Sequence, residues 1–106
     1  MNTLTAAELK TKIDTNSENL FLLDVREPHE FEHCHISGSI LIPMQTIPQR
    51  LADIPKDKTV ISICHHGMRS LQVAQFLLGQ GFNNIINLSG GVNAWAQEVD
   101  STMPRY

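Results

Sequence analysis

The sequence of 106 residues has little of what marks a secreted, membrane-spanning or nucleic-acid-binding protein. Two cysteines, Cys34 and Cys64, are too few for a disulfide framework and indicate reduced thiols. The longest apolar run, residues 20–23, is far shorter than the roughly 20 residues that cross a bilayer. Eight basic and eleven acidic residues give a formal charge of −3, which leaves no basic surface for nucleic acid or anionic lipid.

The chain length allows one domain, placed at residues 1–106 with a core of about 5–99 and a tail at 100–106. The first residues lack the basic and apolar stretches of a secretory signal. Together with the reduced cysteines, this predicts a cytoplasmic protein with neither a membrane nor a nucleic-acid partner.

Apolar runs alternate with helical patterns along the chain, which predicts an α/β fold with a parallel sheet and helices on both faces. Strands are expected at 20–25, 39–42, 59–63 and 85–88. Helices are expected at 5–13, 45–51, 69–78 and 91–99, with a single turn at 27–31. Thr5 and Glu8 have the spacing of a capping box, which starts the first helix.

The segment 59–70 carries the strongest functional signal. A β-branched run ends at Cys64, and a loop containing Gly67 leads to Arg69 at the start of a helix. The first turn of a helix has unpaired N–H groups and the positive end of the helix dipole, and Arg69 adds a permanent charge. This environment favours the thiolate and predicts that Cys64 is a catalytic nucleophile.

The same loop is predicted to bind an anion beside the sulfur. Backbone N–H groups from His65 to Arg69 would form a cradle, and Gly67 permits a positive φ and a close approach of the backbone. Substrate binding is therefore assigned to His65, His66, Gly67, Met68 and Arg69. The two histidines are expected to shape the loop rather than to transfer protons.

The pattern Cys64-x-x-Gly67-x-Arg69-Ser70 resembles the active-site loop of the rhodanese-like sulfurtransferases. Further blocks follow the family's order and approximate spacing over nearly the whole chain, at 23–31, 35–43 and 81–95. Four ordered blocks are a far more specific signal than the cysteine loop alone. The resemblance implies a three-layer fold whose central, mostly parallel sheet has about five strands.

The resemblance also implies a reaction. Cys64 would take the outer sulfur of thiosulfate or a persulfide donor, hold it as a cysteine persulfide without a cofactor, and pass it on. The acceptor would be cyanide, a thiol or a sulfur-accepting protein such as a thioredoxin. Asp24 and Arg26 would support the site from beneath the loop, with Arg26 pairing with Glu30.

Two other functions remain open. A cysteine phosphatase or arsenate reductase also places cysteine and arginine at a helix N-terminus, but with five residues between them, whereas four separate Cys64 from Arg69. A non-catalytic rhodanese-like module would only bind partners. Such modules typically lose the cysteine, which this chain retains.

The segment His33-Cys34-His35, with His29 upstream, contains residue types that bind metals. Its spacing is not that of a closed zinc site. No metal is therefore expected, and Cys34 is expected to be a bystander thiol.

Overall fold

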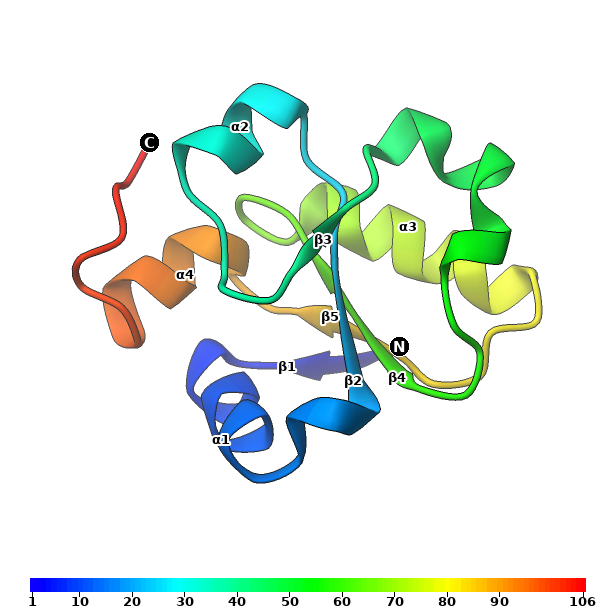
Figure 1. The fold of residues 1–106 in the computed structure, drawn as a ribbon, viewed down its shortest axis with the longest axis horizontal. Coiled ribbons are helices and arrows are strands. Elements are labelled where there is room, and N and C mark those ends of the chain that lie inside the picture. The colour runs from blue at the N-terminus through cyan, green and yellow to red at the C-terminus, as the bar shows by residue number, and fades with distance from the viewer.

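The alternating strand and helix patterns build a five-stranded, fully parallel sheet between layers of helices (Figure 1). The structure is a computed structural model that describes residues 1–106. Across the sheet, in the order β1-β5-β4-β2-β3, the strands are β1 (Asn2–Leu4), β5 (Ile85–Leu88), β4 (Thr59–Ile63), β2 (Leu20–Asp24) and β3 (Ile40–Leu41). The α-helices are α1 (Ala6–Asn16), α2 (Pro28–His33), α3 (Met68–Gly79) and α4 (Gly91–Glu98). Three short 3₁₀ helices are η1 (Ser17–Asn19), η2 (Met44–Gln49) and η3 (Leu51–Asp53).

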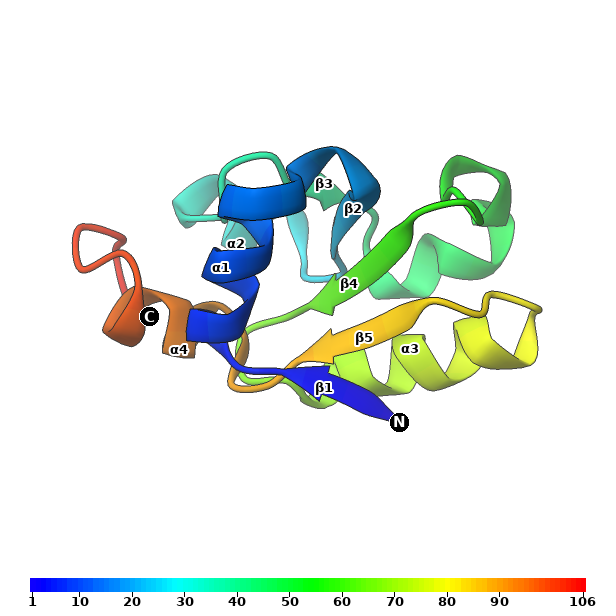
Figure 2. The same cartoon turned by 90° about the horizontal axis from the view of Figure 1, so that it is seen from below.

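Two apolar cores lie on opposite faces of the sheet. Successive strand side chains point to opposite faces, so Ile61 and Ile63 pack with α1 and α4, whereas Val60 and Leu23 pack with α3 and η2. Figure 2 shows α1 and α3 on opposite sides of the strands. The predicted layering is therefore confirmed.

Parallel pairing gathers the carboxyl ends of the central strands at one edge. Asp24, the last residue of β2, pairs in register with Ile63, the last residue of β4. Cys64 therefore leaves the sheet close to Asp24 and Arg26. In open parallel sheets, this edge is where ligands bind.

The N-terminal strand β1 is absent from the sequence prediction, because residues 2–4 show no alternation of apolar and polar side chains. The strand forms by pairing with β5, with Asn2 in register with Ile86. Only Leu4 is partly buried. Backbone pairing, rather than a local apolar pattern, therefore defines β1.

The helix expected at 45–51 is wrong in type: the segment forms the two 3₁₀ helices η2 and η3. Pro48 lies inside η2, where its ring and its missing N–H disfavour an α-helical turn. The tighter 3₁₀ turns still bury Ile47 in the core on the α3 face.

The capping box of α1 is confirmed. The Thr5 hydroxyl accepts from the Glu8 N–H at 3.1 Å, and the Glu8 carboxylate accepts from the Thr5 N–H at 2.9 Å. The helix continues to Asn16, beyond the expected end, and an exposed pair of Lys10 with Asp14 at 2.7 Å adds modest support to this last part.

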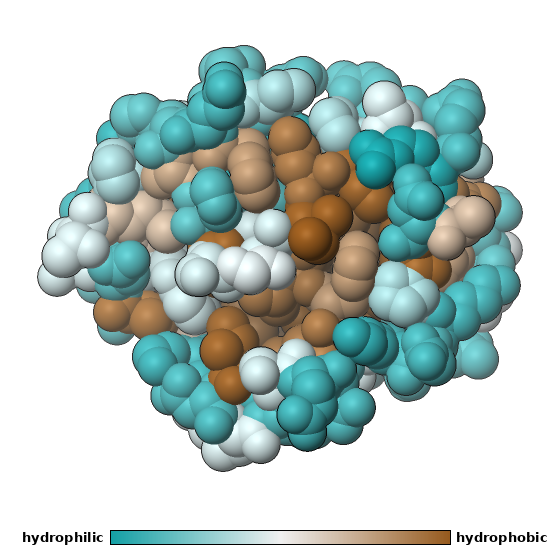
Figure 3. Space-filling model, viewed as in Figure 1, coloured by the Kyte–Doolittle hydropathy of each residue, from teal (hydrophilic) through white to brown (hydrophobic).

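The segment 100–106, expected to be a tail, folds back beside α4 and ends near α2 (Figure 1). Met103 is buried against the core shared by α1 and α4. No helix has both the length and the apolar character needed to span a membrane. The surface in Figure 3 is hydrophobic near the middle of the face and largely hydrophilic around it.

Candidate functional site

Cys64 directly follows β4 and begins a short loop that ends where α3 starts. Gly67 precedes the first helical residue and has a φ of +107°, which only glycine adopts without strain. The Gly67 N–H donates to the Cys64 sulfur at 3.0 Å. Cys64 itself is completely buried, whereas His66 and Met68 of the same segment are exposed.

The remaining N–H groups of this segment have no acceptor within the protein. No hydrogen bond engages the backbone N–H of His65, His66 or residues 68–70. Several of these belong to the first turn of α3, where the helix dipole is positive. The segment therefore offers a group of unpaired donors next to a sulfur atom, which suits a small anion.

Helix α4 explains why the loop presents N–H groups rather than carbonyls. The Cys64 carbonyl accepts from the Val92 N–H at 2.9 Å, and the His65 carbonyl accepts from the Asn93 N–H at 3.0 Å. In a trans peptide the N–H points opposite to the carbonyl. Turning both carbonyls toward α4 therefore turns the N–H groups of His65 and His66 away from it.

The contact with α4 depends on Gly91. A Cβ on Gly91 would lie 2.3 Å from the Cys64 carbonyl oxygen and 2.5 Å from that of His65. Gly91 also has a φ of +57°. Gly91, the first residue of α4, is therefore the residue on which the cysteine loop packs.

A buried polar network holds the other side of the loop. The Asn87 amide donates to the Gly67 carbonyl at 3.2 Å and accepts from the Ser70 hydroxyl at 2.5 Å. The Ser62 hydroxyl donates to the Ser70 carbonyl at 2.9 Å. The prediction missed Ser62 and Asn87, although both are polar residues inside apolar strands and they pair in register.

Arg69 does not stand free beside the sulfur, because it forms a bidentate pair with Glu30 of α2 at 2.7 and 2.9 Å. The pKa of Glu30 falls from 4.5 to about 2, chiefly because of these hydrogen bonds and despite the opposing effect of burial. Arg69 keeps three further N–H donors for other partners. The expected pairing of Arg26 with the Glu30 carboxylate is therefore wrong, since Arg69 occupies it.

Arg26 pairs instead with Asp24, and both side chains are fully buried. Burial alone would lower the pKa of Arg26, but the hydrogen bonds and charge of Asp24 raise it. The guanidinium also donates to the carbonyls of Cys34 and Glu30 and to the hydroxyl of Tyr106. All of its donors are therefore engaged, which offsets the desolvation of a buried charge.

His65 is packed between two other rings. Its ring centroid lies 3.9 Å from that of Tyr106, with the planes 7° apart, and 3.9 Å from that of His66. Burial, and then the neighbouring His66, lower the pKa of His65, so its imidazole is neutral near neutral pH. Its Nε2 is buried without a hydrogen-bond partner.

Cys34 is buried and unpaired, and only its carbonyl contacts the site, through Arg26. No three side chains among His, Cys, Asp and Glu converge in a way that could hold a metal ion.

The chain belongs to the rhodanese-like domain family, whose model matches residues 5–98. It is 39% identical over 82 residues to a sulfurtransferase of Allochromatium vinosum, covering 77% of each chain. It is 36% identical over 80 residues to the thiosulfate sulfurtransferase GlpE of Stutzerimonas stutzeri, covering 76% of this chain and 73% of that one. A rhodanese-like domain protein of Staphylococcus aureus has the same fold, with a TM-score of 0.85 and 32% identity over 100% and 99% of the two chains.

Some relatives are much longer. The chain spans only 27% of the probable adenylyltransferase/sulfurtransferase MoeZ of Mycobacterium tuberculosis, at 36% identity over 107 residues. The sulfurtransferase relatives support a rhodanese-like sulfurtransferase role for this chain.

We expect Gly91→Ala to destabilise the protein by about 2–4 kcal/mol, because it adds both a clash with the Cys64 carbonyl and a strained φ. Gly38→Ala is the matched control, since Gly38 has a φ of +87° but nothing within 4 Å of an added Cβ. Urea denaturation measures both variants. Equal losses in the two variants would show that backbone strain alone matters and that the contact with Cys64 does not.

We expect the Glu30–Arg69 pair to make stability depend on acid pH. A carboxyl with a lowered pKa stabilises the fold above its unfolded pKa, here 4.5, and that stability is lost as pH falls through about 2. Above pH 4.5, the free energy of unfolding of the wild type should therefore exceed that of Glu30→Gln by about 1–2 kcal/mol. The difference is modest because the Arg69 side chain is 36% exposed. The difference should shrink toward pH 2 in denaturation experiments, and a pH-independent difference would contradict the assignment.

Proposed function

We propose that this domain transfers sulfane sulfur from thiosulfate or a persulfide donor to a thiophilic acceptor through a persulfide on Cys64. The observation that carries the proposal is the position of the Cys64 sulfur. It accepts a hydrogen bond from the Gly67 N–H and lies beside the unpaired N–H groups of the loop and of the first turn of α3. The relatives named as sulfurtransferases, one of them a thiosulfate sulfurtransferase, support the same reaction.

The reaction has two balanced steps. The Cys64 thiolate attacks the outer sulfur of thiosulfate, the sulfur–sulfur bond of thiosulfate breaks, and sulfite leaves with the electron pair. The persulfide anion on Cys64 then gives its outer sulfur to cyanide, which leaves as thiocyanate, or to a thiol, which becomes a persulfide. Either acceptor restores Cys64, so sulfur is carried by the cysteine and no separate cofactor is needed.

The charge on these species explains the form of the site. Thiosulfate, sulfite and the persulfide are all anions, and the loop N–H groups together with the remaining donors of Arg69 can stabilise them. Because Glu30 already neutralises Arg69, the anion is held by directed hydrogen bonds more than by net charge. Cys64 is fully buried, so Sγ must become accessible before it can attack a sulfur donor.

Loop length supports sulfur rather than phosphate as the transferred group. Four residues separate Cys64 from Arg69, one fewer than in the cysteine phosphatases and arsenate reductases, so a smaller cradle surrounds the sulfur. The cysteine itself argues against a module that only binds partners. Because Cys34 and Cys64 are both unpaired, we place the activity in the reducing cytoplasm, with a thiol or a sulfur-accepting protein such as a thioredoxin as partner.

Intact-protein mass spectrometry tests the proposal directly. Incubation with thiosulfate should add the mass of one sulfur atom, and cyanide should remove it as thiocyanate. Cys64→Ser should show neither step, while the matched control Cys34→Ser should show both. Wild type that gains no sulfur from thiosulfate or from any persulfide donor, or that hydrolyses an aryl phosphate instead, would overturn the proposal.

Arg69→Ala should lower kcat/KM for thiosulfate about ten- to a hundredfold, since it removes charge-assisted contacts worth about 1.5–3 kcal/mol. The same change leaves the Glu30 carboxylate, only 10% exposed, without its cationic partner, so a loss of stability should accompany it. Arg50→Ala is the control, because Arg50 pairs with Asp53 on the surface. Steady-state kinetics measure both variants, and unchanged kinetics in Arg69→Ala would show that the backbone donors alone bind the anion.

A further inference from the structure

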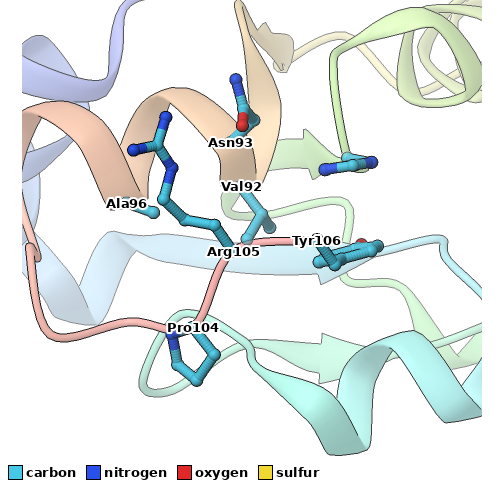
Figure 4. Close-up of a pocket in the computed structure, with 7 residues that line it drawn as sticks. Val92, Asn93, Ala96, Pro104, Arg105 and Tyr106 are labelled. Carbon is cyan, nitrogen blue, oxygen red and sulfur yellow. The ribbon is translucent and has the colours of Figure 1, made fainter.

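Tyr106, the last residue of the sequence, reaches back to the cysteine loop. The segment that carries it runs along α4, where Pro104, Arg105 and Tyr106 face Val92 and Ala96 (Figure 4). Its ring stacks on His65, next in sequence to Cys64. Its hydroxyl lies 2.6 Å from Arg26 Nη1 and 3.0 Å from Glu30 Oε2.

The direction of these two hydrogen bonds follows from chemistry. A guanidinium only donates, so the Tyr106 oxygen accepts from Arg26. The single hydroxyl hydrogen is then free to donate to the Glu30 carboxylate. Tyr106 thus connects the buried Asp24–Arg26 pair to the Glu30–Arg69 pair.

The Glu30 carboxylate is held by four donors. Its Oε1 accepts from Arg69 Nη1 at 2.7 Å and from the Glu27 N–H at 2.9 Å. Its Oε2 accepts from Arg69 Nη2 at 2.9 Å and from the Tyr106 hydroxyl at 3.0 Å. Without the hydroxyl, Oε2 would be held by Arg69 alone, and the two side chains could reorient together.

We propose that Tyr106 is a positioning residue of the sulfur-transfer site: its hydroxyl fixes the Glu30 carboxylate and thereby the orientation in which Arg69 meets an anionic donor. The proposal rests on the proposed function. Its ring adds a second restraint on the same loop, through His65.

The Tyr106 phenol is protonated near neutral pH, as donation to Glu30 requires. Partial burial raises the pKa of Tyr106 to about 12, although Arg26 acts in the opposite direction. The contact with Glu30 contributes to this rise. The hydroxyl can therefore act as a donor near neutral pH.

Tyr106→Phe removes the hydroxyl and keeps the ring on His65. We expect KM for thiosulfate to rise about three- to tenfold with kcat changed less than about twofold, because an anion-orienting contact is weakened. Thr102→Ala is the matched control. It deletes a hydroxyl of the same segment whose only hydrogen bond is to the Asp100 carboxylate, and it should change neither KM nor kcat. Thermal melts should show both variants folded.

A double-mutant cycle separates positioning from a general structural role. If Tyr106 acts through Arg69, Tyr106→Phe should have no further effect on KM in an Arg69→Ala background. Glu30→Gln should raise KM in the same way as Tyr106→Phe. Full additivity of Tyr106→Phe with Arg69→Ala, or an unchanged KM in folded Tyr106→Phe, would overturn the proposal.

Alkylation of Cys64 tests the proposal without sulfur transfer. The ratio of its rates with anionic iodoacetate and neutral iodoacetamide reports how well Arg69 recruits an anion, and site-specific mass spectrometry excludes Cys34. Tyr106→Phe should lower the ratio about threefold, and Thr102→Ala should not. A protein that never accepts sulfur but shows this shift would refute the proposed function alone, whereas an unshifted ratio would refute the role of Tyr106.

Discussion

The candidate site depends on the close approach of the Gly91 backbone to the carbonyl oxygens of Cys64 and His65. There is no room for a Cβ at this contact, and the two carbonyls accept the N–H groups of Val92 and Asn93. The contact thus gives the first N–H groups of α4 hydrogen-bond acceptors. It also turns the loop peptides so that their own N–H groups point away from α4. The orientation of the loop peptides therefore follows from hydrogen bonds made by a different helix.

The second constraint is charge pairing. Asp24 and Arg26 are both fully buried, which is tolerable only because every donor of the guanidinium has an acceptor. Glu30 and Arg69 repeat this arrangement nearer the surface, and Tyr106 connects the two pairs. The site therefore carries little uncompensated charge, so the proposed binding of an anion would depend on the direction of its N–H groups. This agrees with a protein whose overall charge is negative.

Much of this could be predicted from the sequence, because the signals were local. The strands β4 and β5 have the predicted bounds, since each is a short, mainly apolar segment rich in β-branched residues, with turn residues before it. The loop from Cys64 to Arg69 was found because a strand, a glycine and a helix start follow each other within a few residues. The 3₁₀ form of η2 was missed, although Pro48 lies in its middle.

What the sequence by itself determined is the order of elements and the chemistry of one contiguous loop, because periodicity, capping and turn residues act over a few positions. The tertiary structure alone decided which residues complete that loop. The pairing of Glu30 with Arg69 rather than Arg26, the contact of Gly91 with the loop, and the position of Tyr106 at its edge join segments that are far apart in the chain. Their contacts arise from the parallel pairing that gathers the strand ends and from the packing of α2, α4 and the last segment around them, and no local pattern encodes those distances.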